Sequence, residues 1–270
     1  MAKTDAATGN RVLYLSHGAG PMPLLGDAGH AQMLATLQQV ASAMPRPESI
    51  VLMSAHWEEA APTVTTGTSL PLIYDYYGFP EESYEIAYPA PGAPWLAKAC
   101  HALLAAEGLS PVADAARGYD HGMFVPLKIM YPEADIPCIQ VSLVKGLDAG
   151  VHLRMGQALA GLADEGVLFV GSGFSFHNMR AFFMQDTPAT RAMNEGFDAW
   201  LTETCSGGNL APEERLLRLA GWEEAPHARY CHPREEHLLP LHVCCGIAGG
   251  AKATPFSLEL LGKKTSMFLW

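Results

Sequence analysis

Four histidines occur just past apolar runs or at the start of a predicted helix, each in its own short motif. They are His17 in Leu-Ser-His-Gly, His56 in Met-Ser-Ala-His-Trp, His177 in Gly-Phe-Ser-Phe-His-Asn and His237 in Arg-Glu-Glu-His-Leu-Leu, and a fifth, His121, lies in Tyr-Asp-His-Gly. A metal centre needs neutral imidazoles that converge from remote parts of the chain, and strand ends can hold them rigidly. The pattern therefore predicts a metalloenzyme.

His17, His56 and His177 would face one crevice if the strands before them are neighbours in an open α/β sheet, where ligands bind beyond the strand ends. His237 would join them from a helix start, together with the two glutamates that precede it. Imidazoles suit iron(II), zinc and copper, and two histidines with one carboxylate leave iron(II) an open face for substrate and dioxygen. The residues alone leave the third ligand open between His237 and a glutamate. Four further histidines are interpreted as structural residues held by hydrogen bonds: His30, His101, His152 and His242.

The elements that must position these histidines alternate between short apolar runs and segments of helical periodicity. This alternation predicts the α/β class, with one domain over residues 1–270 and a central, mostly parallel or mixed sheet flanked by helices. Strands are predicted at 11–15, 49–53, 63–66, 137–143, 167–170, 254–260 and 265–269, the last two antiparallel. Helices are predicted at 29–43, 95–107, 122–131, 151–164, 189–204, 212–219 and 235–247, the last despite Pro240.

A segment rich in tyrosine, glycine and proline covers residues 71–94. Loops of this length in compact domains usually carry function or form a lid, although packing and turn structure are the alternative interpretation. Rings from this loop and from the histidine motifs are candidates for stacking on an aromatic substrate: Trp57, Tyr74, Tyr77, Phe79 and Phe176. Polar side chains that could address a carboxylate on that substrate are Asn178, Arg180 and Arg234.

The composition is 49% apolar and 17% charged in 270 residues, which predicts a folded chain with a sizeable core. A net charge of -11 argues against nucleic acid and anionic membranes as partners. No apolar run approaches the roughly 20 residues of a membrane span, and the N-terminus lacks the apolar core of a signal peptide. Six cysteines without a Cys-x-x-Cys pair predict reduced thiols in a cytoplasmic protein. A homodimer is compatible with these features.

The motifs together resemble the class III extradiol ring-cleavage dioxygenases, in their 4,5-DOPA dioxygenase-like branch. The matching segments run in family order through almost the whole chain: 15–18, 54–57, 78–80, 88–92, 119–122, 130–137, 171–173, 177–178 and 236–241. The resemblance implies a non-haem iron(II) enzyme. It implies that a catechol, DOPA-like or otherwise substituted, is cleaved with dioxygen to a muconic semialdehyde.

The resemblance implies His17, His56 and His237 as ligands of iron(II), with zinc as a substitute in purified protein. It implies His177 as the acid/base histidine near the metal, and His121 as a pocket residue that hydrogen-bonds substrate or oxygen. Glu235 and Glu236 are kept as ligands or as partners of ligands. Two departures from the family pattern predict a pocket unlike that of DOPA-cleaving relatives: the extra glycine in 17–22 and the sequence Phe174-Ser175-Phe176.

Two other classes of function remain open from the residues. A zinc hydrolase would use metal-bound hydroxide with Glu236 as base, and dependence of activity on dioxygen separates it from a dioxygenase. A binding protein on the same scaffold would lack catalysis altogether. The sequence does not specify the natural catechol, the cleavage position or the oligomeric state.

Overall fold

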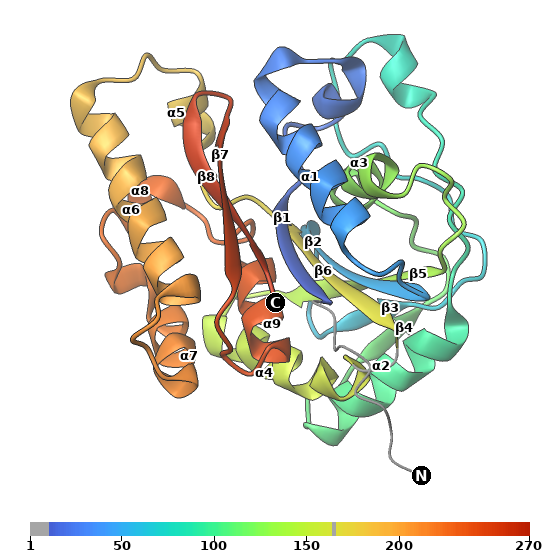
Figure 1. Ribbon diagram of the computed structural model, residues 1–270. Coiled ribbons are helices and arrows are strands. Elements are labelled where there is room, and N and C mark those ends of the chain that lie inside the picture. Colours follow the sequence, from blue (N-terminus) through green and yellow to red (C-terminus); the bar gives the residue numbers. More distant parts are fainter. Residues whose placement is uncertain (1–10, 164–165) are drawn as a thin grey trace.

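A mixed sheet runs through the centre of the structure, a computed structural model that describes residues 11–163 and 166–270 (Figure 1). Within these residues the sheet has eight strands in the order β4-β3-β5-β2-β6-β1-β8-β7. The strands are β1 (Val12–Ser16), β2 (Ser49–Glu59), β3 (Thr63–Thr65), β4 (Val112–Asp114), β5 (Cys138–Val144), β6 (Val167–Gly173), β7 (Thr254–Leu260) and β8 (Lys263–Leu269). The predicted α/β class with a mixed, helix-flanked sheet is confirmed. The N-terminal residues used above to judge a signal peptide lie mostly outside the described residues.

The four central strands β5, β2, β6 and β1 are parallel to one another. Their side chains are almost all buried, as expected for parallel strands covered on both faces by helices. Antiparallel pairing joins β8 to β1 and to β7 on one side, and β3 to β5 on the other, where the edge strand β4 is parallel to β3. The antiparallel pairing predicted for the last two strands is confirmed. Strand β4 was not predicted, because Val112 and Ala113 are exposed and form no apolar run.

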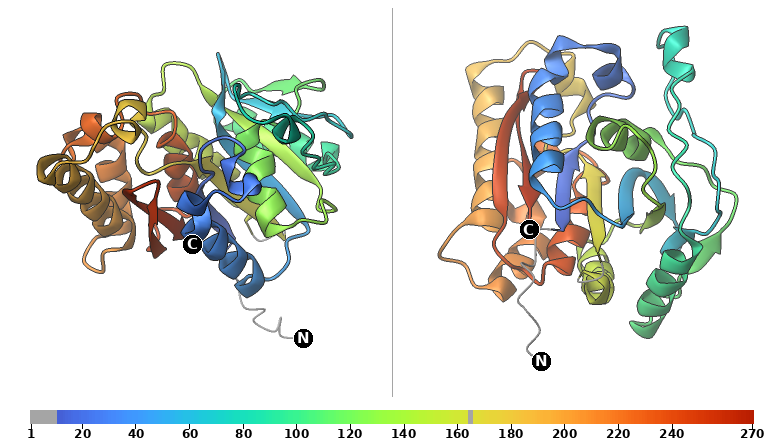
Figure 2. Two further views of the ribbon diagram at one scale, coloured as in Figure 1. Left: turned by 90° about the horizontal axis from the view of Figure 1, so that it is seen from above. Right: turned by 45° about the vertical axis from the view of Figure 1, so that its right-hand side comes forward.

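Helices cover both faces of this sheet (Figures 1 and 2). On one face lie α1 (Ala31–Ala43) and α3 (His121–Met130), and on the other lie α2 (Pro94–Ala106), α4 (Ala149–Leu159) and α9 (Leu239–Ile247). The apolar helix α9 packs directly on β1, β2 and β6. The β7–β8 hairpin extends between α1 and α6 (Pro188–Ser206). Helices α7 (Pro212–Ala220) and α8 (Ala228–Cys231) contact α6, and α5 (Met179–Phe182) lies near one end of the hairpin (Figure 1). Part of the helix predicted at 151–164 lies outside the described residues.

The carboxyl ends of β1 and β6 lie level with the middle of β2. Ser172 of β6 is paired with Leu15 of β1 on one side and with Ser54 of β2 on the other. Because parallel strands end at the same edge, the residues that follow these three positions emerge together. His17 follows β1 by one residue, so the register alone brings it next to the end of β6.

Strand β2 is longer than predicted, because an irregularity lets it continue through His56. Between Met53 and Glu58, β2 advances by five residues while β5 advances by two, from Val141 to Leu143. Such bulges re-aim side chains and are common beside active sites. His56 therefore lies within the strand, not after it as the apolar pattern suggested.

Helix α9 begins at Leu239, so the helix predicted from residue 235 is wrong in its first turn. Proline is well tolerated in the first turn because its missing N–H has no intrahelical partner there. Pro240 is therefore the second residue of the helix, and the predicted continuation of the helix beyond it is confirmed. Residues 235–238 form a turn instead, closed by a hydrogen bond from the Leu238 N–H to the Glu235 carbonyl.

No helix in the described ranges is both long and apolar enough to cross a membrane. All six cysteines lie in the described ranges, and each is buried as a free thiol, as the absence of a cysteine framework predicted.

A buried histidine far from solvent makes the stability of the fold dependent on pH. His242 on α9 lies within hydrogen-bond reach of the Leu219 and Leu238 carbonyl oxygens, at 2.8 and 3.3 Å. Burial lowers the pKa of His242 to about 4, outweighing these carbonyls, which act to raise it. Between this value and the ordinary value of about 6.5 the unfolded chain binds the proton and the folded chain does not.

We therefore expect the free energy of unfolding to fall as the pH drops from about 6.5 to about 4, with His242 contributing up to about 3 kcal/mol. Denaturant unfolding of the metal-free protein at both ends of this pH window measures the decrease in the free energy of unfolding. In the variant His242→Asn this decrease should be smaller than in the wild type. The other ionisable groups are common to both proteins, so the difference isolates His242. Equal losses in wild type and variant would contradict the expectation.

Candidate metal centre and active site

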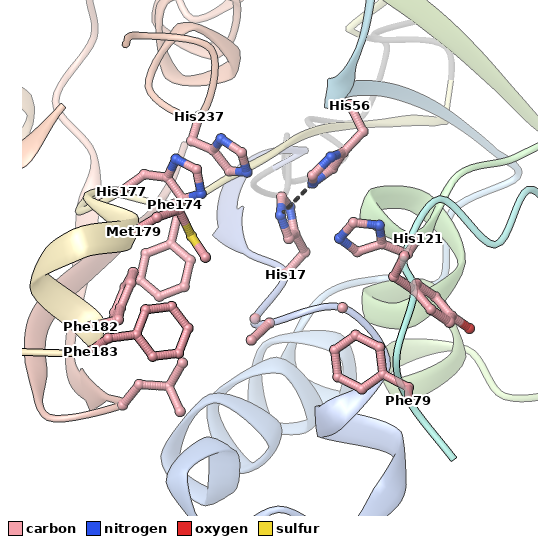
Figure 3. Close-up of a pocket in the computed structure, with 15 residues that line it drawn as sticks. His17, His56, Phe79, His121, Phe174, His177, Met179, Phe182, Phe183 and His237 are labelled. Carbon is pink, nitrogen blue, oxygen red and sulfur yellow. Dashed lines mark hydrogen bonds between the residues drawn. The ribbon is translucent and has the colours of Figure 1, made fainter. Parts of the chain in front are cut away.

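Five imidazoles converge above the carboxyl ends of the central strands (Figure 3). His17 follows β1, His56 lies in β2, His121 is the first residue of α3, His177 follows β6 and His237 precedes α9. The ring centroids of His17, His56 and His237 lie 4.8 to 5.2 Å apart. One ring nitrogen from each of these three lies within 4.8 Å of the others, which is a spacing that one ion can bridge.

Hydrogen bonds at Nδ1 orient the rings of His17 and His237 and leave Nε2 of each free. His17 Nδ1 lies 2.9 Å from Ser172 Oγ. The Ser172 hydroxyl donates its own hydrogen to the Gly122 carbonyl, so His17 Nδ1 is the donor in the first bond. His237 Nδ1 donates to Glu236 Oε1 over 2.9 Å. Both rings therefore keep the Nε2 lone pair for a metal, with the partner at Nδ1 fixing the ring.

The spacing of the free nitrogens fits one divalent cation. His17 Nε2 and His56 Nε2 lie 3.1 Å apart. Two nitrogens bound to one metal at about 2.1 Å and at right angles lie about 3 Å apart. Two imidazole lone pairs facing each other at this distance repel unless a cation or proton lies between them. The donor set of His17, His56 and His237 thus suits a metal that accepts nitrogen ligands.

The three imidazoles are electrically neutral. Burial, reinforced by the neighbouring imidazoles, lowers the pKa of His17 and of His237 well below the ordinary value. Burial also lowers the pKa of His56 to about 3, although the carboxylate of Asp75 acts to raise it. The neutral form is the one that binds a metal.

Glu236 connects the metal ligand candidates to His177. Its Oε1 accepts from His237 Nδ1 and lies 3.1 Å from His177 Nδ1, while Arg234 lies 3.3 Å from Oε2. The His177 and His237 rings stack with centroids 3.4 Å apart. Burial acts to raise the pKa of Glu236, but the hydrogen bond from His177 and the charge of Arg234 outweigh it and lower that pKa. Glu236 is therefore an ionised partner of two imidazoles.

The neighbouring Glu235 is directed elsewhere. It accepts a hydrogen bond of 2.6 Å from Arg229, which also pairs with Glu223. Of the two glutamates that the sequence kept in reserve, Glu236 alone contacts the histidine cluster. The same Oε1 could belong to a second ligand group with His177 and His237. Since that oxygen already accepts from Nδ1 of both rings, we assign it to orienting them.

Asp75 was not singled out from the sequence. Its Oδ1 accepts from His121 Nδ1 over 2.8 Å and from the His121 backbone N–H over 3.0 Å, and its Oδ2 lies 3.6 Å from His56 Nδ1. Burial acts to raise the pKa of Asp75, but the hydrogen bonds from His121 and the nearby imidazoles lower it to about 2. One signal was present: Asp75 is the only charged residue in the run 71–80 of the tyrosine-rich loop.

The backbone of His237 is held by three contacts with the sheet. Its carbonyl accepts from the Tyr14 hydroxyl at 2.9 Å and from the Phe174 N–H at 3.0 Å. A Cβ on Gly173 would lie 2.0 Å from that carbonyl oxygen, so only glycine permits the approach. The motif Gly171-Ser172-Gly173 ends β6, and its last glycine permits this close packing.

The histidines open into a cavity of about 610 Å³. Of the rings predicted to stack on a substrate, Phe79 lines this cavity. Tyr77 is 93% exposed and points away from it. Trp57 is buried, donates its indole N–H to Glu59 and carries Arg117 over its ring at 4.5 Å.

Phe176 and Asn178 also lie outside the cavity lining. Phe176 is fully buried, edge-on to Phe182 and Tyr230. Asn178 caps α5: its side-chain oxygen accepts from the Ala181 N–H, and its amide donates to the Tyr230 carbonyl. These two side chains build the wall behind the cavity, a role that their proximity to His177 in the sequence did not reveal.

Comparison with known proteins decides the family. The family model for the catalytic LigB subunit of aromatic ring-opening dioxygenases matches residues 12–268. The chain belongs to this family. It is 41% identical to the dioxygenase tasH of Hapsidospora irregularis, over 96% of this chain and 85% of the relative. It is 38% identical to the 4,5-DOPA dioxygenase extradiol of Beta vulgaris, over 87% of this chain and 86% of the relative.

A crystal structure of an uncharacterized protein from Escherichia coli K12 shares the fold of this dioxygenase. The TM-score is 0.74 at 31% sequence identity, covering 96% of this chain and 99% of that one. The predicted membership of the class III extradiol dioxygenases is confirmed. The prediction of a ring-cleavage dioxygenase is also confirmed, and the family favours it over the alternatives of a hydrolase and a binding protein. Enzymes of this family depend on a metal, for which the histidine cluster is the fitting site.

The shared carboxylate leads to a prediction about metal retention. We expect Glu236→Gln to weaken metal binding by about 10- to 100-fold, because the orienting charge on His237 is lost. Competition with a chromophoric chelator measures the affinity, and circular dichroism checks the fold. Glu235→Gln is the matched control and should bind metal as the wild type does. Equal affinities in the two variants would rule out the orienting role of Glu236.

Proposed function

We propose that this dioxygenase cleaves the ring of a catechol with dioxygen, using one iron(II) held by His17, His56 and His237. The observation that carries the proposal is the meeting of three neutral imidazoles, spaced for one ion, at the end of an aromatic cavity. The printed names of relatives, 4,5-DOPA dioxygenase extradiol, support a catechol as the substrate class. Zinc suits the same nitrogen donors and would be a substitute occupant.

The product of this reaction is a muconic semialdehyde. Both oxygen atoms of dioxygen remain in the product, and the bond that breaks joins a hydroxylated ring carbon to its unhydroxylated neighbour. The chemistry supplied by a bound iron(II) is the simultaneous binding of catechol and dioxygen and the passage of electrons between them. The protein supplies position, proton transfer and exclusion of water.

His177 is the proposed acid/base group. Its Nδ1 lies 3.1 Å from the Glu236 carboxylate, and its ring lines the cavity beside His237. With Nδ1 donating to Glu236, Nε2 is free to accept the proton of a catechol hydroxyl. Glu236 then stabilises the positive charge that develops on the ring, and the same nitrogen returns the proton later in the reaction. Imidazole is the side chain best suited to this exchange near neutral pH.

His121 is the proposed hydrogen-bonding partner of the substrate or of oxygen. It lines the cavity across from His177, and its ring centroid lies 4.0 Å from that of His56. Asp75 takes the Nδ1 hydrogen and so directs the other nitrogen of His121 toward the cluster. Asp75 acts through His121 and is a positioning residue in this proposal.

Oxygen consumption tests the proposed reaction. Metal-free protein is loaded with iron(II) without air, mixed with a panel of catechols and then exposed to oxygen. We expect oxygen uptake matched one to one by a yellow ring-opened product. Protein that holds one equivalent of iron yet consumes no oxygen with any catechol would overturn the proposal.

Two histidine variants test the division of roles. His177→Ala should retain iron and lose turnover by about 100-fold or more, the usual contribution of a general acid or base. His237→Ala should lose both iron and activity. Metal content per chain and kcat are measured on the same samples. If His177→Ala loses the metal and His237→Ala keeps it, the proposed roles are exchanged.

A further inference from the structure

The cavity has a polar end and an otherwise apolar wall. Among the described residues, its only ionisable or polar side chains are the five histidines and Tyr76. The Tyr76 hydroxyl is already committed, since it donates to the Ser83 carbonyl at 2.6 Å. The rest of the lining is glycine, alanine, leucine, methionine and phenylalanine. No lysine, arginine, asparagine, glutamine, serine or threonine side chain within the described ranges lines it.

Of three cationic side chains near the site in sequence, two are paired with carboxylates and the third does not line the cavity. Arg234, considered from the sequence as a partner for a substrate carboxylate, pairs with Glu58 at 2.6 Å and with Glu236 at 3.3 Å. Arg180 is exposed and does not line the cavity. Lys263 is buried and pairs with Asp186. No cationic side chain of the described residues therefore borders the cavity to pair with an anionic substituent.

The entrance adds further apolar surface. Met179, Phe182 and Phe183 of the α5 segment form one wall, and Phe79 of the tyrosine-rich loop lies across from them (Figure 3). The Phe183 side chain is 84% exposed although it borders the cavity. Covering large exposed apolar side chains around a cavity removes apolar surface from water and so favours the binding of an apolar ligand. The volume of about 610 Å³ lies within the usual range for drug-sized ligands, and so leaves room beyond a single catechol ring.

We propose that the preferred substrate is a catechol whose substituent is uncharged and apolar, and that carboxylated catechols, amino acids of the DOPA type included, are disfavoured. The inference rests on the proposed function and specifies its substrate class. Burying a carboxylate without a partner is costly.

A matched substrate pair tests this preference. Methyl 3,4-dihydroxyphenylacetate and 3,4-dihydroxyphenylacetate share one skeleton; the ester carries a methyl group where the acid carries a negative charge. With the iron-loaded enzyme we expect kcat/KM for the ester to exceed that for the acid by about tenfold or more. An acid that is cleaved as well as the ester, or better, overturns the proposal.

Binding without oxygen separates this inference from the proposed reaction. The affinities of the iron-loaded protein for the ester and the acid are measured by calorimetry in the absence of air. Tighter binding of the ester without any turnover in air would support the substrate class and contradict the proposed reaction. Turnover of both compounds with equal affinities and equal kcat/KM would support the reaction and overturn the substrate class.

A pair of exposed positions provides matched variants. Phe183→Arg places a cation at the cavity wall and should raise the acid-to-ester ratio of kcat/KM by about fivefold. Met184→Arg adds the same charge at the next residue, which is 69% exposed and does not line the cavity, and should leave the ratio unchanged. A ratio that Phe183→Arg leaves unchanged, or that both variants shift equally, would contradict discrimination by the cavity wall.

Discussion

The site depends on keeping several imidazoles neutral while they crowd together away from water. Charged rings at these distances would repel, so burial and mutual proximity both favour the unprotonated form of His17 and His237. A neutral ring has one donor and one acceptor nitrogen. The Ser172 hydroxyl oxygen accepts the hydrogen bond from His17 Nδ1, and the Glu236 carboxylate accepts that from His237 Nδ1. What remains is a set of lone pairs directed at one point, which is the requirement for a metal centre.

Contacts of the backbone fix the positions from which these histidine side chains extend. The parallel register places Leu15, Ser172 and Ser54 side by side, and the irregularity in β2 brings His56 into the same space. The glycine at position 173 lets the carbonyl of His237 lie against β6, where Tyr14 also holds it. His17 and His237, which are 220 residues apart in the chain, are thus held close together by contacts of their backbones with β1 and β6.

Much of the fold and the main histidines could be predicted because they follow local rules. Apolar runs mark the buried strands, and His17 and His177 come soon after two of them. The position of His56 within β2 could not be predicted, since the irregularity exists only relative to β5. The contacts of Asp75 and Glu236 likewise depend on distant segments meeting. Trp57 was expected to face the substrate, but the alternation along the bulged strand turns it under Arg117.

Strand β1 is made early in synthesis, but its partner β8 and His237 are made near the end. One flank of β1 stays open until β8 has been made, because Leu13 pairs with Leu269. The cluster is also incomplete on the ribosome until His237 has emerged. Contacts of such sequence separation slow folding, because the entropy of closing the long loop is lost before they can form. The complete set of His17, His56 and His237 therefore exists only after nearly the whole chain has been made.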